Sequence, residues 1–399
     1  MGRALLLALL VLLVAPLGTV QATVGGSGHP PVAGATRPDV AILTLNGTSR
    51  ASFTTASLDL GTTLAVQHDA AAATLDRYAI DERFNRTAST EARKTLLFES
   101  ATAVEIRIAA LRDQERATRS AYASRDIDTA TFLRQLAVMH ARVSDLRTAL
   151  DDVQNHADRI PQFSMRGRVR RLDATLYGME GPLRQRALDA MTGDAKSARL
   201  YVAVSNGGLV LSTIEDGRYR REAYRADHRD TETVSGMSIT EAADLAERLY
   251  PVAYNTSSSI RTGIVGLSGG LYRLDIERRQ GTITAYLDGA TRQVFFEVQE
   301  RRLDLLDARP SVTATANGTR LTVNRTFPGG PLEVAVTDET GTPVRRTLVV
   351  EGHRFGTDAA GQAWTLAPAT PFEVTAVGPA GNVTVDVRPT EPTPVAAEG

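Results

Sequence analysis

The sequence predicts a multi-domain α+β protein: an N-terminal antiparallel helical hairpin or bundle, a central antiparallel sheet with one helix, and a C-terminal β-sandwich. Three observations predict this class. Apolar residues recur at alternating steps of four and three between residues 62 and 160, and the period changes to two between residues 197 and 300. From residue 311 onward, short alternating segments are separated by regular turns.

The strongest helical pattern lies between Phe132 and Ile160. Its apolar positions form one seam along a helix, which a second helix must cover. The seam residues are Phe132, Leu136, Met139, Val143, Leu146, Leu150, Val153 and Ile160. The short polar link 124–128 forces the helices on either side of it to run antiparallel.

Two earlier segments, 62–83 and 87–123, carry similar spacing and are expected to cover this seam. In the first of them the pattern falls on Leu64, His68, Ala71, Leu75 and Tyr78. If these helices leave part of the seam bare, the remainder favours a homodimer.

The N-terminus predicts export. Arg3 precedes the apolar run Ala4–Ala15, Pro16 breaks the run, and small residues allow cleavage after Ala22. The run has 12 residues, whereas a spanning helix needs ~20. We therefore predict a cleaved signal peptide, with an uncleaved anchor helix as the alternative. No later segment approaches spanning length, so the mature chain is expected to be extracellular or at the cell surface, without a transmembrane span.

Asparagine usage also favours export. Six of the eight asparagines begin an Asn-x-Ser/Thr triplet, and the 20 serines and 45 threonines among 399 residues would give only about one or two by chance. These asparagines are Asn46, Asn85, Asn255, Asn317, Asn324 and Asn382. For any one triplet a Thr-rich loop is an equal alternative, but the excess predicts a glycosylated surface.

Composition removes several functions. With 45 basic and 46 acidic residues the formal charge is −1, which argues against a nucleic-acid partner. The chain has no cysteine, so disulfides, thiolate zinc sites and cysteine nucleophiles are excluded. The histidines lack ligand spacing, and we predict no metal, cofactor or catalytic residue. Four arginines at 166, 168, 170 and 171 indicate the solvated start of a helical segment that runs to about Met191, with an anionic partner as the alternative.

Residues 197–300 carry the signals of a sheet. Asn206-Gly207 and Asp216-Gly217 predict tight turns, and Ser238-Ile239-Thr240-Glu241 is a capping box that opens a helix to Tyr250. We expect strands at 200–205, 209–214, 219–224, 260–267, 271–279, 282–287 and 293–298, and a short helix at 299–308. Gly266-Leu-Ser-Gly-Gly matches the G-x-S-x-G nucleophile elbow, but the motif needs a helix after it and the next segment alternates as a strand. A catalytic Ser268 is therefore not expected.

The central segment resembles a PepSY-type unit. The helix 239–250 precedes a strand pair that ends in a Tyr-x-Asp-x-x-Thr-like signature, matched by Tyr286, Asp288, Thr291 and Val294. Arg292 stands where that family usually has glycine. PepSY units are associated with peptidase propeptides and with surface binding or inhibition, so the resemblance implies interaction.

A wider block also resembles a group of secreted proteins from halophilic archaea that has no established activity. The resemblance rests on Tyr219-Arg-Arg-Glu-Ala-Tyr, Leu249-Tyr-Pro and Phe296-Glu-Val-Gln. The resemblance implies secretion and a similar architecture, but no particular activity.

The C-terminal segment resembles the carboxypeptidase-regulatory, transthyretin-like sandwich. The matching stretches begin at Val336, Thr357 and Pro371. In that family the unit is an accessory fold without catalytic residues.

The predicted division is a signal peptide at 1–22, a linker with a short strand at 23–61, a coiled-coil-like helical bundle at 62–195, a PepSY-like α+β domain at 196–309, an immunoglobulin- or transthyretin-like β-sandwich at 310–389 and a disordered tail at 390–399.

These inferences predict an exported, glycosylated, non-enzymatic interaction or scaffold protein with a protein partner at the cell envelope. Two alternatives stay open. The PepSY-like unit could regulate or inhibit a secreted peptidase, or the chain could be an exported hydrolase whose site is assembled from distant residues.

Overall fold

The computed structural model describes residues 41–233, 236–255, 261–267, 270–306 and 309–395. The predicted signal peptide, the first part of the linker, Ser268 and the last four residues lie outside these ranges. None of the helices within them combines the length and hydrophobicity that crossing a bilayer requires.

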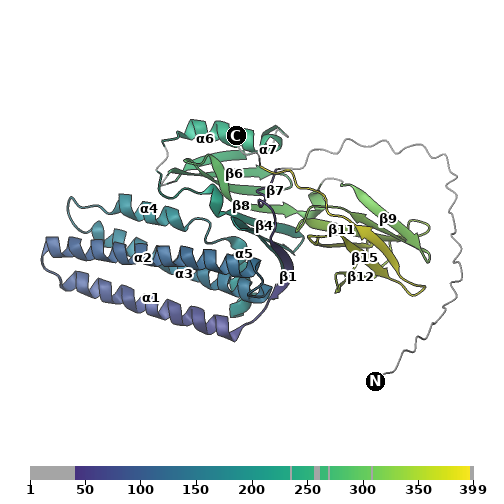
Figure 1. The fold of residues 1–399 in the computed structure, drawn as a ribbon, viewed down its shortest axis with the longest axis horizontal. Helices are drawn as coiled ribbons and strands as arrows, with labels where there is room; N and C mark the ends of the chain where they lie inside the picture. Colours follow the sequence, from purple (N-terminus) through teal and green to yellow (C-terminus); the bar gives the residue numbers. More distant parts are fainter. Residues whose placement is uncertain (1–40, 234–235, 256–260, 268–269, 307–308, 396–399) are drawn as a thin grey trace, which may run out of the picture. The chain divides into compact units, whose positions relative to one another are not determined.

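The N-terminal part is helical. Its elements are α1 (Leu60–Arg86), α2 (Thr90–Ala123), α3 (Thr129–Ala157), α4 (Arg166–Leu176) and α5 (Pro182–Thr192). Side-chain caps open the three long helices, because Asp59, Ser89 and Asp128 each accept a hydrogen bond from a backbone N–H of the first turn. Figure 1 shows α1, α2 and α3 side by side, with α1 at the outer edge.

The central part is an eight-stranded antiparallel sheet in the order β1-β2-β3-β4-β8-β7-β6-β5. Its strands are β1 (Arg50–Ala56), β2 (Ala198–Val204), β3 (Gly208–Glu215), β4 (Arg218–Arg225), β5 (Arg261–Gly266), β6 (Leu271–Arg278), β7 (Gly281–Asp288) and β8 (Gln293–Arg302). Asp216 and Gly217 both have positive φ in the β3–β4 turn, which is the type I′ geometry expected of Asp-Gly.

Each face of this sheet packs against helices. Along β2, Leu200 and Val202 belong to the core shared with α2–α5, whereas Tyr201 and Ala203 belong to the core shared with α6 (Ile239–Leu249) and α7 (Pro251–Asn255). The predicted capping box at the start of α6 is confirmed, with both reciprocal hydrogen bonds between Ser238 and Glu241. Short 3-10 turns follow β4 and β8, at Ala226–His228 and Leu303–Leu305.

The C-terminal part consists of two four-stranded antiparallel sheets that enclose one apolar core. The first has the order β14-β11-β10-β9 and the second β13-β12-β15-β16. The strands are β9 (Ser311–Ala316), β10 (Thr319–Asn324), β11 (Pro331–Asp338), β12 (Thr347–Val350), β13 (His353–Gly356), β14 (Gln362–Leu366), β15 (Phe372–Val377) and β16 (Val383–Val387).

An extended segment at 41–45 lies across the α6 face of the central sheet. Its attachment centres on Glu297, which is fully buried and accepts hydrogen bonds from Leu43 N (3.0 Å) and Tyr250 Oη (2.6 Å). Arg221 pairs with the same carboxylate (3.3 Å) and donates to the Leu43 carbonyl (2.6 Å). Burial raises the pKa of Glu297, while Arg221, Tyr250 and the Leu43 N–H act in the opposite direction.

Four predicted boundaries are wrong. The long helix ends at Ala157, so Ile160 is buried beyond its end. The helix expected up to residue 191 is two helices, α4 and α5, because the chain turns at Gly178 in a left-handed conformation. The helix expected at 299–308 begins as strand, since β8 continues to Arg302 opposite both β4 and β7, and only the short 3-10 turn Leu303–Leu305 follows among the described residues.

The fourth error concerns the predicted linker and the predicted C-terminal tail. The strand of this region is β1 at 50–56, which pairs with β2, whereas the segment near residue 42, expected as a strand or an extended arm, is extended and contributes a single bridge. The tail is ordered through Val395: Ile42 N donates to the Thr393 carbonyl (2.9 Å), and Val395 N donates to the Ile42 carbonyl (3.0 Å). Backbone pairing to a distant segment therefore fixes residues whose composition resembles a disordered tail.

Candidate interaction surface on the N-terminal helices

The predicted seam residues, seven of them on α3 and Ile160 just beyond its end, lie inside the helical core. All eight are at most 7% exposed, and their neighbours in the core include Leu97, Ala101, Val104, Ile108 and Leu111 of α2. The helix α3 contacts α1, α2, α4, α5 and β1. Because so many elements share its surface, the seam is covered within one chain.

The helix α1 does not cover the seam in the expected way. Leu64, Leu75 and Tyr78, which carry the predicted four-three pattern, are 67%, 69% and 70% exposed. The buried residues of α1 are instead Thr62 and Phe84, near its two ends. The periodicity correctly identifies an apolar stripe, but that stripe faces solvent.

We define the outer face of α1 as nine exposed residues that lie along one side of the helix between residues 60 and 79. None of them is Asp, Glu, Lys or Arg. They are Leu60, Leu64, Ala65, His68, Ala71, Ala72, Leu75, Tyr78 and Ala79. Four of the eight large hydrophobic side chains that are exposed in the described part of the chain belong to this face. Such a concentration makes this face a candidate interaction site, whereas single exposed apolar residues are ordinary.

The charged residues of α1 are all engaged within the chain. Asp69 pairs with Arg142 (2.8 Å), Asp76 with Arg107 (2.5 Å) and Arg77 with Asp152 (2.5 Å). Further contacts join Asp81 to His156, Arg83 to Glu99 and Arg86 to Glu82. Most of these pairs hold α1 against α2 and α3, so the outer face is left without a charge of its own.

A groove runs between α1 and the α2–α3 pair. Two adjoining hollows of about 280 and 350 Å³ share Ala73, Asp76, Arg107, Asp145 and Leu146 in their linings. Among the described residues, no donor or cation binds the half-buried carboxylate of Asp145. Burial raises the pKa of Asp145 and the neighbouring Asp69 raises it further, while Arg77 lowers it.

The PepSY-like signature is absorbed into the fold. Asp288 is buried and accepts hydrogen bonds from the N–H groups of Ala290 (2.8 Å) and Thr291 (3.0 Å), so it shapes the β7–β8 turn. The Thr291 hydroxyl donates to the His228 carbonyl (2.7 Å). Arg292, in the place of the usual glycine, has φ +57°, a left-handed conformation that glycine adopts more readily.

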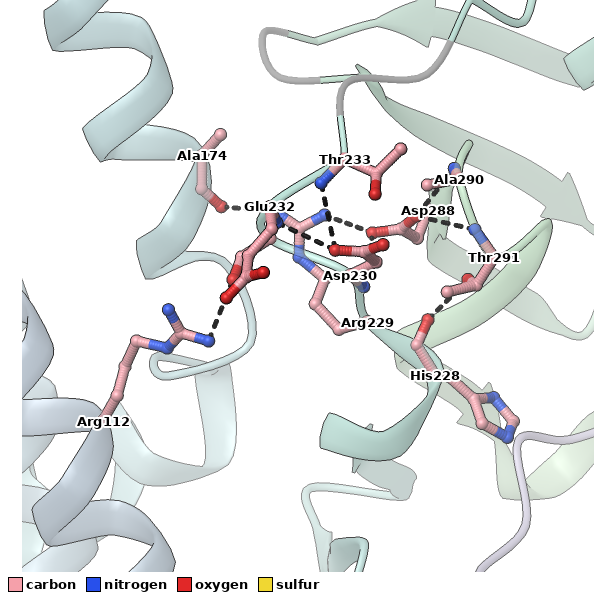
Figure 2. A network of polar contacts seen from close by, with 11 residues as sticks. Arg112, Ala174, His228, Arg229, Asp230, Glu232, Thr233, Asp288, Ala290 and Thr291 are labelled. Atoms are coloured by element: carbon pink, nitrogen blue, oxygen red, sulfur yellow. Dashed lines mark hydrogen bonds and ion pairs between the residues drawn. The ribbon is translucent and has the colours of Figure 1, made fainter.

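Asp288 also joins the sheet to the helices. Arg229 donates to the Asp288 carboxylate (2.6 Å) and to the Ala174 carbonyl of α4 (3.1 Å), and Figure 2 shows its guanidinium between these two acceptors. From α2, Arg112 donates to the Thr231 hydroxyl (3.1 Å). We call these contacts the Asp288 clasp. Its polar atoms are occupied by partners from the same chain, which makes it structural.

A second buried pair ties α5 to the sheet. Arg184 and Glu222 are 1% and 0% exposed, and the Arg184 Nε lies 2.9 Å from the Glu222 carboxylate. The same carboxylate accepts from Leu183 N (2.9 Å) in the first turn of α5. These groups escaped sequence reasoning, because nothing in local periodicity distinguishes a buried arginine from a solvated one.

The predicted glycosylation positions are mostly accessible. Asn46, Asn85, Asn317 and Asn382 are exposed. Asn324 is half-buried on β10 and its amide donates to Glu333 (2.7 Å). The side chain of Asn255 lies outside the described residues.

The arginine cluster, the histidines and the serine motif are the remaining sequence candidates. Arg166 and Arg168 pair with Asp158 and Glu105. In the described part of the chain, no three His, Asp or Glu side chains are grouped so that they could hold a metal ion. The segment after the serine motif is the strand β6, not the helix that a nucleophile elbow requires.

The fold and the surface thus define a three-part protein of N-terminal helices, a central antiparallel sheet and a C-terminal pair of sheets. Family models match these parts in turn: residues 1–196 match a domain of unknown function (DUF7096), residues 200–307 match a family of unknown function (DUF7094), and residues 310–385 match an archaeal fibronectin-III type-like domain. These matches are consistent with the archaeal resemblance. The family model for the C-terminal part is fibronectin-III-like, whereas the sequence resemblance implies a transthyretin-like unit.

No curated protein and no solved structure matches the chain.

The Asp288 clasp gives a prediction about stability. Replacing Asp288 with Asn leaves the buried guanidinium of Arg229 without its counter-charge, so we expect a loss of roughly 3–5 kcal/mol in the free energy of unfolding. The matched control is Asp304→Asn, which breaks an exposed pair with Arg302 and should change the free energy of unfolding very little. Urea unfolding of the full chain measures both. Equal effects of the two variants would contradict a structural role for the clasp.

Asp145 gives a prediction about pH. Because its folded-state pKa is raised, its charge lowers stability at neutral pH, and this cost disappears as the pH falls below the unfolded-state pKa of about 3.9. Asp145→Asn should therefore stabilise the chain at pH 7, by less than about 1 kcal/mol because solvent screens the charge, and by clearly less at pH 4, where the unfolded-state carboxyl is already about half protonated.

The exposed Asp151 supplies the control for this pH experiment, since Asp151→Asn should leave stability unchanged at both pH values. Urea unfolding at the two pH values gives the comparison. A gain from Asp145→Asn that is the same at pH 4 and pH 7 would show that the carboxylate charge is not its cause.

Proposed function

We propose that this chain is an exported, glycosylated and non-enzymatic interaction or scaffold protein of the cell surface or the extracellular space. The observation that carries the proposal is the outer face of α1. A helix that turns nine residues other than Asp, Glu, Lys and Arg to solvent, while its acidic and basic residues bind its own chain, is arranged to contact another molecule.

The C-terminal part supports the extracellular placement. It matches an archaeal fibronectin-III type-like domain, and we propose that its two sheets form a sandwich that acts as a spacer or adhesive module. The predicted signal peptide and the excess of Asn-x-Ser/Thr triplets support the same placement. Four of the six asparagines are exposed, as modification requires.

The buried carboxylates favour a scaffold over an enzyme. Glu222, Asp288 and Glu297 each bind an arginine and at least one backbone N–H of the same chain. A general acid or base must reach its substrate, whereas these groups are closed off by their partners. Their arrangement fits a role in fixing elements in place.

Recovery of a tagged chain from its native producer tests this proposal. We expect it in the medium or the envelope fraction, beginning at Thr23, carrying glycans on asparagines, and in a complex larger than one chain. Leu64→Arg combined with Leu75→Arg should reduce the complex to a single chain without unfolding it, because both side chains are exposed. The control Ile239→Arg changes an exposed residue of α6 and should preserve the complex. A cytosolic chain that still begins at Met1 would overturn the export proposal.

Regulation of a secreted peptidase is a second candidate. The order of α6 followed by β5–β8 is the order that the PepSY resemblance implies. If this candidate is correct, the purified full chain should inhibit a peptidase secreted by the same cells at stoichiometric concentration. Undiminished peptidase activity with the chain in excess would remove it.

A further inference from the structure

We propose that the outer face of α1 binds the outer face of α1 in a second copy of the chain, with the two helices antiparallel. This inference rests on the proposed function, because it names the partner of the surface that carries it. The proposed function and the proposed self-association can nevertheless fail separately. A chain that does not self-associate could still be exported and bind a different protein.

Charge argues for a partner with an equally uncharged surface. The outer face carries no Asp, Glu, Lys or Arg, and the charged residues of α1 already bind within the chain. A charged partner would lose hydration at this surface and gain no ion pair in return. The chain itself presents a helical surface with the required chemistry.

The order of side chains along the face is self-complementary. The face runs from Leu60 to Ala79, so its midpoint lies between residues 69 and 70. An antiparallel pair centred there brings Leu64 opposite Leu75 of the second copy, and Leu75 opposite the second Leu64. Leu60 then meets Ala79 beside Tyr78, and no charged residue of the last turn enters the contact.

The middle of the face suits a close approach. At the midpoint His68 comes opposite Ala71 of the second copy, so a larger side chain meets a small one at each of two equivalent places. The exposed alanines 65, 72 and 79 recur at every seventh position and keep one edge of the face narrow. Antiparallel packing also opposes the two helix dipoles, whereas parallel packing would align them.

The size of the face indicates a weak dimer. Twenty residues at 1.5 Å each span about 30 Å, and a helix about 10 Å wide then contributes roughly 300 Å² from each copy. Standard stable interfaces bury about 800 Å² from each partner. We therefore expect a reversible dimer that forms with increasing protein concentration.

Engineered cysteines test the pairing directly, because the natural chain contains none. A double variant with Leu64→Cys and Leu75→Cys should form covalent dimers on mild oxidation, since the two positions face each other across the pair. Within one helix these positions are about 16 Å apart, too far for an internal disulfide. Leu64→Cys alone and Leu75→Cys alone should not cross-link. In the antiparallel pair, each of these positions lies about 16 Å along the helix axis from the same position in the second copy.

Matched measurements separate the outcomes. An equimolar mixture of the two single variants should cross-link, whereas dimers of Leu64→Cys alone would instead indicate a parallel pair and overturn the proposed geometry. In sedimentation experiments, the natural chain and the Ile239→Arg variant should approach twice the mass of one chain at high concentration. The double variant Leu64→Arg with Leu75→Arg should keep the mass of a single chain. A natural chain that stays monomeric at every concentration would overturn the dimer, while a complex with a foreign protein recovered from cells would leave the proposed function intact.

Discussion

Burial of α3 on nearly all sides sets the positions of the other N-terminal elements. Its apolar residues pack into a core shared with α2, α4, α5 and the inner side of β2 and β3. Since these elements already fill most of the seam, little apolar surface remains for α1. The helix α1 is accordingly attached by Phe84 and Thr62 near its ends and by ion pairs along its length.

This manner of attachment accounts for the exposed stripe. Partly exposed ion pairs contribute little stability each, commonly less than about 1 kcal/mol, but they fix which side of a helix faces inward. With its charges turned toward α2 and α3, α1 has only uncharged residues left on the opposite side. In a protein without cysteine, stability must come from the cores, and an apolar face outside them is best explained by a contact made between molecules.

Buried ion pairs play a different part elsewhere. Those of Glu222, Asp288 and Glu297 connect an element to the sheet, respectively α5, the loop that reaches α4, and the segment at 41–45. Such pairs add little net stability compared with apolar contacts, but an unpaired buried charge is costly. Any arrangement that separated the partners would leave a buried charge unpaired. The pairs therefore fix the positions of these elements against the sheet.

Sequence periodicity predicted the elements well and their partners poorly. The strands β2–β8 of the central sheet, the Asp-Gly turn and the capping box follow from local patterns, and the structure has them within a few residues of the expected positions. The orientation of α1 could not be predicted, because a four-three pattern identifies an apolar stripe without saying whether the covering surface lies in the same molecule. Likewise β1, the end of β8 and the ordered tail depend on pairing with distant strands, which alternation within a short window does not encode.

Hydrogen exchange of residues 60–86 at low and high protein concentration tests the central claim most directly. If the outer face of α1 is covered by another copy, the amides of this helix should exchange more slowly at high concentration while those of α3 remain unchanged. Exchange in α1 that is independent of protein concentration would contradict the account, since the face would then remain open to solvent in the assembled state.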